Sequence, residues 1–343
     1  ARTVGAAGRR TQLMRGLMPR GMLGRRALLA SGVMLADMTL AAARVGAQTT
    51  ELRLGVLQFG TVQWVADVIR RHGLDRRHGF TLTGRTLANT DAGRISLMAG
   101  ANDVVLLDWP FVVAQRQAGN RLCFAPFSSA TGGIMTPADS IIRGLGDLRG
   151  RRLGVAGGPA DKSWLVVRAA AHAQPRIDLA SEATCVYGAP PLLSAKLQQG
   201  ELDAVLTYWN FAAKLEAAGF REVISVSDCL KALDIPPDLG MVGWVFAEDY
   251  KPINDFLAAV SEAEQMLADS PAEWDAVRPL MNADNDGVFR RLRDRFLHGR
   301  QIAEPDAQVR GAQRLLSVLH QAGAEANETL PPGVFWPVRH GSG

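Results

Sequence analysis

The fold is decided by the stretch Leu193-Ser-Ala-Lys-Leu-Gln-Gln-Gly200-Glu-Leu-Asp-Ala-Val-Leu-Thr-Tyr-Trp-Asn210. Residues 193–199 have the spacing of a helix, Gly200 ends that helix, and residues 203–207 form a short apolar run typical of a buried strand. A helix that leads directly into a buried strand is typical of α/β proteins, in which right-handed crossovers connect parallel strands. The stretch therefore predicts the α/β class.

The same alternation continues on both sides of this stretch. In the first half of the chain it predicts strands at 52–58, 80–87 and 104–107, and helices at 62–71, 94–99 and 111–117. It restarts with a strand at 152–156 and a helix at 164–173. It ends with strands at 223–226 and 241–246 and helices at 253–269, 271–281, 287–298 and 306–322. Because there are two series of strands, we expect two lobes, each with its own sheet.

The N-terminal segment has the composition of an export signal. Gly24-Arg25-Arg26-Ala27-Leu28-Leu29 opens a modestly apolar run, and Val45-Gly46-Ala47 is a small-residue cleavage site. The paired arginines are typical of twin-arginine signals. We therefore expect residues 1–47 to be removed and the remaining chain to be periplasmic. The alternative is an N-terminal membrane anchor, for which the run is short and weakly apolar.

The same segment accounts for the basic character of the chain. Residues 1–47 contain eight arginines and one aspartate, so the formal charge of +4 for the whole chain becomes about −3 without them. The remaining charge balance does not indicate nucleic acid as a partner.

The three cysteines, Cys123, Cys185 and Cys229, lie far apart in the sequence, without C-x-x-C spacing. An oxidising compartment would allow one disulfide among them, and the spacing does not select the pair. The alternative is three small buried apolar residues.

Two motifs carry a resemblance to a known family. Asp147-Leu-Arg-Gly-Arg-Arg-Leu-Gly-Val-Ala-Gly-Gly-Pro159, followed by Lys162-Ser163, resembles the start of the second lobe in extracytoplasmic solute receptors. Ala195-Lys-Leu-Gln-Gln-Gly-Glu-Leu-Asp-Ala-Val205 resembles the later helix–glycine–strand signature of those receptors. Over most of residues 52–270 the chain is similar to the nitrate/sulfonate/taurine and thiamine-precursor class of periplasmic substrate-binding proteins, which serve ABC importers.

The resemblance implies an α/β fold of the two-lobed, type II periplasmic-binding-protein kind, whose lobes close on a ligand like a hinged clamp. It places the two crossing segments near 134–140 and 228–240. Lobe 1 would then comprise residues 48–136 and 238–343, and lobe 2 residues 137–237. The resemblance also implies a monomeric receptor that delivers a small molecule to an ABC permease.

Ligand contacts are expected in the loops that follow the carboxyl ends of the parallel strands. These ends, together with one tryptophan on the returning strand, form the candidate site: Gln58, Phe59, Thr61, Trp64, Asp108, Trp109, Gly157, Gly158, Lys162, Ser163, Tyr208, Trp209, Asn210 and Trp244. The aromatic residues among them would supply flat apolar walls or a cage for an amine, and the alternative for each is a position in the core.

Two parts of the candidate site favour ligands of opposite charge. Asp108 suits a ligand ammonium or ring N–H, and it equally suits the role of N-cap for the helix that follows it. Gly157 and Gly158, with Lys162 and Ser163 at a helix start, suit a carboxylate, sulfonate or phosphate, or else form only a tight turn. Of the ligand classes, a nitrogen heterocycle or amine is favoured over an alkylsulfonate.

The chain lacks the spacings that indicate a metal site or a catalytic motif. Asn282, Asp284 and Asp286 imitate the start of a calcium loop, but Arg293 stands where a bidentate glutamate is needed. Zinc spacing and the G-x-S-x-G motif are absent. We therefore expect no metal, no cofactor and no enzyme activity. Two alternatives to the solute receptor are a periplasmic accessory protein that binds another protein and an enzyme on the same scaffold.

Overall fold

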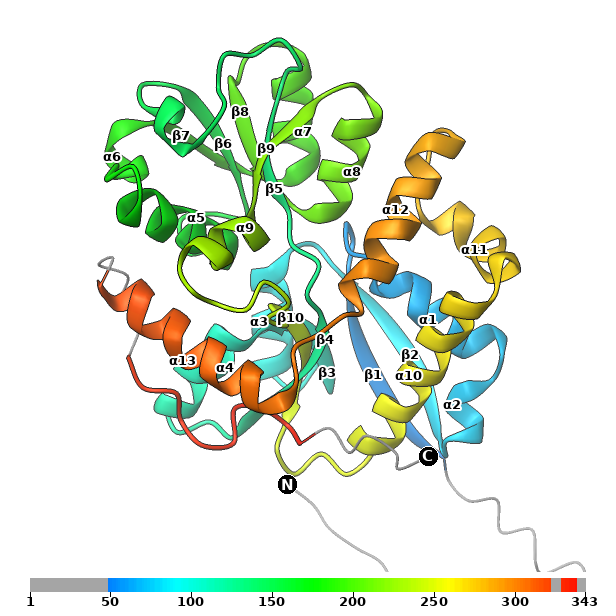
Figure 1. Cartoon of the computed structure of the whole chain (residues 1–343). Coiled ribbons are helices and arrows are strands. Elements are labelled where there is room, and N and C mark those ends of the chain that lie inside the picture. Colours follow the sequence, from blue (N-terminus) through cyan, green and yellow to red (C-terminus); the bar gives the residue numbers. More distant parts are fainter. Residues whose placement is uncertain (1–48, 322–327, 338–343) are drawn as a thin grey trace, which may run out of the picture. The chain divides into compact units, whose positions relative to one another are not determined.

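The first of two five-stranded sheets combines four strands that precede the second sheet in the chain with one strand that follows it (Figure 1). The computed structural model describes residues 49–321 and 328–337, so the predicted signal at 1–47 lies outside the described residues. The sheet contains β1 (Thr50–Leu57), β2 (Phe80–Leu87), β3 (Val104–Asp108), β4 (Leu122–Ser128) and β10 (Val242–Ala247). Its order is β2-β1-β3-β10-β4, with β1 parallel to β2 and β3, and β10 antiparallel to β3 and β4.

The second sheet repeats this arrangement. It contains β5 (Gly133–Thr136), β6 (Arg152–Ala156), β7 (Thr184–Gly188), β8 (Ala204–Thr207) and β9 (Arg221–Ser225). Its order is β7-β6-β8-β5-β9, with β6 parallel to β7 and β8, and β5 antiparallel to β8 and β9. Each sheet thus receives one antiparallel strand that follows a crossing from the other sheet.

The predicted lobe boundary after residue 136 is wrong. Ile134 of β5 pairs with Leu206 and Ile224, so β5 already belongs to the second sheet and the first crossing is residues 129–132. A Cβ atom on Gly132 would lie 1.7 Å from the Thr207 carbonyl oxygen, so the crossing enters the sheet in direct backbone contact with β8. β5 is short and lacks the preceding helix and glycine that marked the equally short β8 in the sequence. The second crossing is residues 233–241.

Helices cover both sheets. Around the first sheet lie α1 (Val62–Arg71), α2 (Leu74–Arg77), α3 (Thr90–Met98), α4 (Trp109–Gln117), α10 (Ile253–Asp269), α11 (Pro271–Val277), α12 (Asp286–Gly299) and α13 (Pro305–Gln321). Around the second lie α5 (Lys162–Ala173), α6 (Leu179–Glu182), α7 (Pro190–Gln198), α8 (Trp209–Ala217) and α9 (Val226–Ala232). In the described part of the chain, no helix is both long and apolar enough to cross a bilayer.

The apolar core continues from one lobe into the other. One cluster of buried side chains includes Leu107 of β3, Val155 of β6, and Leu315 and Leu316 of α13. Helix α13, which lies beside the first sheet, also contacts α5 of the second lobe. The lobes are therefore joined by apolar packing as well as by the two crossing segments.

The cysteines form no disulfide with one another. Cys123 and Cys229 are buried, and Cys185 is half-buried. Burial raises the pKa of Cys123 to about 11 and that of Cys229 to about 12. These two thiols are therefore protonated and behave as small apolar side chains.

Candidate ligand-binding site

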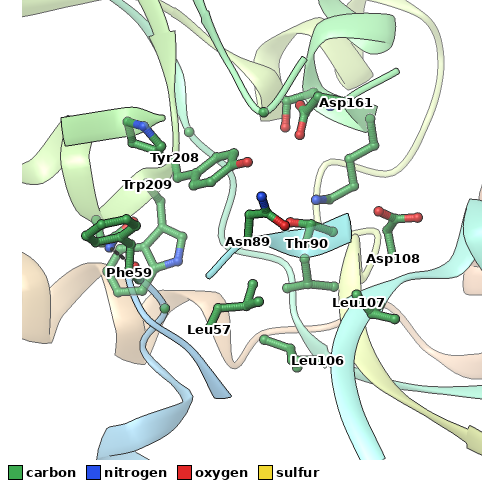
Figure 2. A pocket seen from close by; sticks show the side chains of 18 of the residues that line it. Leu57, Phe59, Asn89, Thr90, Leu106, Leu107, Asp108, Asp161, Tyr208 and Trp209 are labelled. Carbon is green, nitrogen blue, oxygen red and sulfur yellow. Dashed lines mark hydrogen bonds between the residues drawn. The ribbon is translucent and has the colours of Figure 1, made fainter. Parts of the chain in front are cut away.

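A cavity of about 480 Å³ lies where parallel strands of both sheets end (Figure 2). The residues that terminate or follow β1, β3, β6, β7 and β8 line it, and helices α3, α4, α5 and α8 begin at its walls. This is the edge at which open α/β sheets bind ligands. The cavity therefore occupies the place that the strand ends predicted.

The walls of the cavity differ in chemistry (Figure 2). Leucines form an apolar floor, aromatic rings form one side, and hydrogen-bonding groups are spread over the rest of the lining. In this order the residues are Leu57, Leu106 and Leu107; Phe59, Tyr208 and Trp209; and Asn89, Thr90, Asp108 and Asp161. Such a lining suits a small molecule with one apolar face and a polar edge.

Most of the predicted contact residues line this cavity: Phe59, Thr61, Asp108, Gly157, Gly158, Lys162, Ser163, Tyr208, Trp209 and Asn210. They come from both lobes. At one rim the lobes also touch, because the Asn210 side-chain amide donates to the Phe59 carbonyl oxygen at 3.1 Å. The Phe59 ring packs edge to face against Phe211, with 6.5 Å between ring centroids.

The remaining predicted contacts, Gln58, Trp64, Trp109 and Trp244, are not among the residues that line this cavity. Gln58 is exposed beside the cavity. The three tryptophans are core residues, with Trp64 2% exposed, Trp244 1% and Trp109 0%. The position of a tryptophan near a strand end therefore did not determine which way its ring faces.

Each of the three buried tryptophans packs against rings from distant segments. Trp109 lies against Phe335 of the C-terminal segment, with centroids 6.3 Å apart, and Trp244 lies against Phe127 at 4.9 Å. Trp64 packs edge to face under Trp209 at 6.0 Å. Trp64 thus supports the cavity wall without reaching the cavity.

Asp108 serves as a helix cap. One of its carboxylate oxygens accepts from the Phe111 backbone N–H at 3.0 Å, and the other accepts from Arg94 Nη2 at 3.2 Å. Both oxygens are therefore engaged by the protein, as expected for a buried carboxylate. Of the two roles predicted for Asp108, the N-cap is the one that this geometry supports.

Asp161 lines the cavity but was not among the predicted contact residues. It caps α5: one oxygen accepts from the backbone N–H groups of Ser163 at 2.9 Å and Trp164 at 3.3 Å. Two of the donors that we expected to hold an anion are therefore occupied by this carboxylate. Its position directly before a helix was the available signal, because aspartate is a preferred N-cap.

The environment of Asp161 disfavours its charged form. Burial raises the pKa of the Asp161 carboxyl, Asp108 acts in the same direction, and Lys162 opposes both. In Figure 2 the Asp161 carboxylate points into the cavity, towards Asn89 and Thr90 on the far side. A buried carboxylate of this kind is a strong acceptor for a donor that a ligand brings.

Tyr208 approaches the same space from the aromatic side. Burial, with the charges of Asp161 and Asp108, raises the pKa of its hydroxyl, so the group stays protonated. Gly157, at φ +94°, makes room: a Cβ atom there would lie 2.8 Å from Asp161 Oδ2 and 2.9 Å from the Tyr208 hydroxyl. A side chain at this position would therefore displace both groups.

The start of α3 contributes residues that were not predicted, among them Asn89, Thr90, Asp91 and Arg94. They were missed because the predicted helix began at residue 94. In the structure Asn89 caps α3 by accepting from the Ala92 backbone N–H at 2.8 Å. The signal for this earlier helix start was the asparagine shortly after β2, because asparagine is a preferred N-cap.

Lys162 is the cation of the cavity that lacks an ion pair. Arg94 contacts Asp91 and Asp108 at 3.4 and 3.2 Å, whereas Lys162 makes no such contact among the described residues. Within the same residues, no three His, Cys, Asp or Glu side chains are grouped so that they could hold a metal ion.

Comparison with solved structures relates this architecture to periplasmic binding proteins. The alkanesulfonate-binding protein SsuA from Xanthomonas axonopodis pv. citri, bound to MOPS, matches with a TM-score of 0.65 and 16% identity, over 84% of this chain and 98% of that chain. The aliphatic sulphonate binding protein SsuA from Escherichia coli matches with a TM-score of 0.65 and 17% identity, over 83% and 92%. A variant of DszB in complex with biphenyl-2-sulfinic acid matches with a TM-score of 0.52 and 16% identity, over 80% and 93%.

These likenesses confirm the predicted two-lobed type II periplasmic-binding-protein fold. The model of the family described as NMT1/THI5-like matches residues 89–274, which include both motifs on which the resemblance was based. A search of curated proteins found no match.

Proposed function

This chain belongs to the NMT1/THI5-like family, and we propose that it is an extracytoplasmic solute receptor of an ABC importer. It captures a small organic molecule between its lobes and delivers it to the permease. The observation that carries the proposal is the cavity of about 480 Å³, which residues of both lobes line at the carboxyl ends of parallel strands. A ligand that touches both lobes stabilises the arrangement that it bridges, and the permease can recognise that arrangement.

The cellular location follows from the same proposal. The basic and apolar segment at residues 1–47 supports export, and the protein then acts as a monomer in the periplasm. Its family and the sulfonate-binding structural neighbours support this assignment.

For the ligand we propose a nitrogen heterocycle or an amine. Asp161 supports this class, because it lines the cavity and uses only its Oδ1 to accept from the start of α5. Phe59, Tyr208 and Trp209 offer rings against which a flat or cationic group can pack. An N–H of the ligand would donate to Asp161 while its flat face lies between the rings and the leucine floor.

A sulfonate is the second candidate ligand. Lys162 supports it, because within the described ranges this cation has no ion pair. The start of α8 supports it because no side chain caps that helix. Two of the structural neighbours are named as sulfonate-binding proteins.

The two alternatives to a receptor receive less support from the cavity. An accessory protein that binds another protein does not require inward polar groups such as Asp161 and Asn89. An enzyme of the kind that uses a cysteine or histidine would need one in the cavity, and no cysteine or histidine is among the described residues that line it.

The test is thermal unfolding of the purified protein with a panel of pyrimidines, amines, betaines, taurine, alkanesulfonates and nitrate. A ligand at 100 times its Kd stabilises the folded state by about 2.7 kcal/mol, which is a shift of several degrees in Tm. A well-folded protein that responds to no small molecule would contradict the receptor proposal and favour the accessory protein.

Asp161→Asn tests the ligand class. Asparagine is also a good N-cap, so the variant keeps the start of α5 while losing the charge. We expect its affinity for an amine to fall about tenfold or more, because one charge-assisted hydrogen bond is lost. Asp178→Asn, which changes the N-cap of α6 away from the cavity, is the control and should bind normally.

The pH dependence provides a second readout of Asp161→Asn. Because the pKa of Asp161 is raised above 3.8, wild-type affinity for a cationic ligand should increase as the pH rises through that higher value. The variant should lack this increase. If the ligand is a sulfonate, Asp161→Asn should instead bind as well as wild type or better, and Lys162→Met should bind weakly.

A further inference from the structure

A second cavity, of about 300 Å³, lies between α7, α8 and the start of α12. Its lining residues include Ser194, Phe211, Lys214 and Val288, and none of the residues lining it borders the first cavity. Phe211 separates the two spaces, because it packs against Phe59 of the first cavity and lines the second. The second cavity is therefore a separate place to which the proposed solute site assigns no role.

Lys214 brings a half-buried positive charge to this cavity. Among the described residues its ammonium makes no ion pair, and it lies 5.8 Å from the centroid of the Phe211 ring. Burial lowers the pKa of Lys214, and only Asp284 opposes that effect. A partly desolvated ammonium that has only a distant counter-charge is stabilised by an anion that can reach it.

Ser194 supplies an independent observation. Its side chain is only 8% exposed, it lines the cavity, and its hydroxyl has no hydrogen-bond partner in the described structure. A buried hydroxyl without a partner costs stability. In the described rotamer the hydroxyl oxygen is covered by protein atoms. A rotation of the Ser194 side chain about χ1 would bring the hydroxyl to the cavity surface, where an oxygen atom of a bound ligand would accept its proton and remove that cost.

The start of α12 adds a favourable dipole. Asn285 caps this 14-residue helix by accepting from the Val288 backbone N–H at 3.0 Å, and both residues line the cavity. Asp286 in the first turn is paired with Arg278. Asp284 is exposed at the rim, where solvent screens its charge more than that of the half-buried Lys214.

We propose that this second cavity binds a small oxyanion, the oxygen atoms of which are held by the Lys214 ammonium and the Ser194 hydroxyl. The shared chemistry is a compact group with several acceptor oxygens, either inorganic sulfate or phosphate or an organic carboxylate. This proposal does not depend on the solute that the first cavity takes.

The experiment is calorimetric titration of the purified protein with sulfate, phosphate and acetate at constant ionic strength, with chloride as the balancing anion. We expect saturable binding of at least one of the three. Lys214→Met should weaken it about tenfold or more, and Ser194→Ala should weaken it several-fold. Methionine keeps the apolar stem and removes an unpaired charge, and Lys214→Gln serves if the first variant fails to fold.

One lysine control distinguishes this site from the general surface. Lys231→Met removes an exposed lysine that is paired with Asp228 and should leave binding unchanged. Anion binding that Lys162→Met abolishes belongs to the first cavity and not to this site. The proposal is overturned if no anion binds saturably, if the folded Lys214 variants bind like wild type, or if all binding disappears with Lys162→Met.

Discussion

At the scale of single residues, tryptophans at equivalent positions of the two lobes differ in burial. Trp109 follows β3 and Trp209 follows β8, and each is the first residue of a helix. Trp109 is completely buried against Phe335, whereas Trp209 lines the cavity and rests on Trp64. The difference comes from the C-terminal segment, which covers the first lobe at this point.

This difference predicts separate effects for two alanine substitutions. Trp109→Ala leaves a large void in the core and should lower the free energy of unfolding by about 3–5 kcal/mol. Trp209→Ala removes a wall of the cavity and should weaken solute binding about tenfold or more while costing less stability. Urea unfolding and ligand titration of both variants are the measurements. Equal losses of affinity with equal stability would contradict these assignments.

At the scale of elements, the first residues of several helices line the cavity. The group that makes the free energy of unfolding depend on pH lies instead in the middle of a helix. Glu264 lies in α10, and burial raises the pKa of its carboxyl to about 7, with Arg300 opposing the change. The ordinary pKa of a glutamate carboxyl is 4.5, and this value applies to the unfolded chain. Between these two values the folded state holds a proton that the unfolded state has released, so stability is lost as the pH rises through this window.

Glu264→Gln should therefore stabilise the protein at pH 8 by about 2 kcal/mol and have little effect at pH 4.5. Urea unfolding at the two pH values is the measurement. Glu262→Gln, in the same helix, is the control: contacts with His78 and Arg77 lower the pKa of Glu262, so its removal should give no stabilisation at pH 8. A pH-independent effect of Glu264→Gln would rule out the assignment.

At the scale of the whole described unit, the lobes are joined by strands, apolar packing and an ion cluster. Arg295 of α12 contacts Glu216 of α8 at 2.6 Å and Glu222 of β9 at 3.4 Å. Burial raises the pKa of the Glu222 carboxyl, and Arg295 opposes this. Without the arginine, two nearby carboxylates would lack their shared counter-charge.

Arg295→Met should therefore weaken the contact between the lobes. We expect a several-fold loss of solute affinity, because the ligand must then supply more of the energy that holds the lobes together, and a larger radius of gyration without ligand. Small-angle scattering and ligand titration are the measurements. Arg291→Met is the control, because Arg291 lies 3.8 Å from Glu216 and is 48% exposed. The cluster has no role in closure if both variants behave like wild type.

The sequence pattern predicted best those elements that a clear period or a neighbouring helix marks. The helix at Ile253–Asp269 and the strand at Arg152–Ala156 were predicted with the bounds that the structure has, whereas β4, β5 and β7 were missed. A helix of 17 residues shows its period over several turns. The four buried residues of β8 follow a helix that ends at a glycine, but the four buried residues of β5 have no such signal before them.

The sequence by itself determined the class of the fold and the edge of the sheets at which the cavity lies, because alternating helices and buried strands allow few arrangements. Only the tertiary structure decided which side chains at that edge face the cavity. That choice depends on partners far away in the sequence: Phe335 covers Trp109, and Trp64 supports Trp209. It also depends on helix caps, because Asp108 is engaged by Arg94 while Asp161 borders the cavity. Local patterns do not contain these contacts.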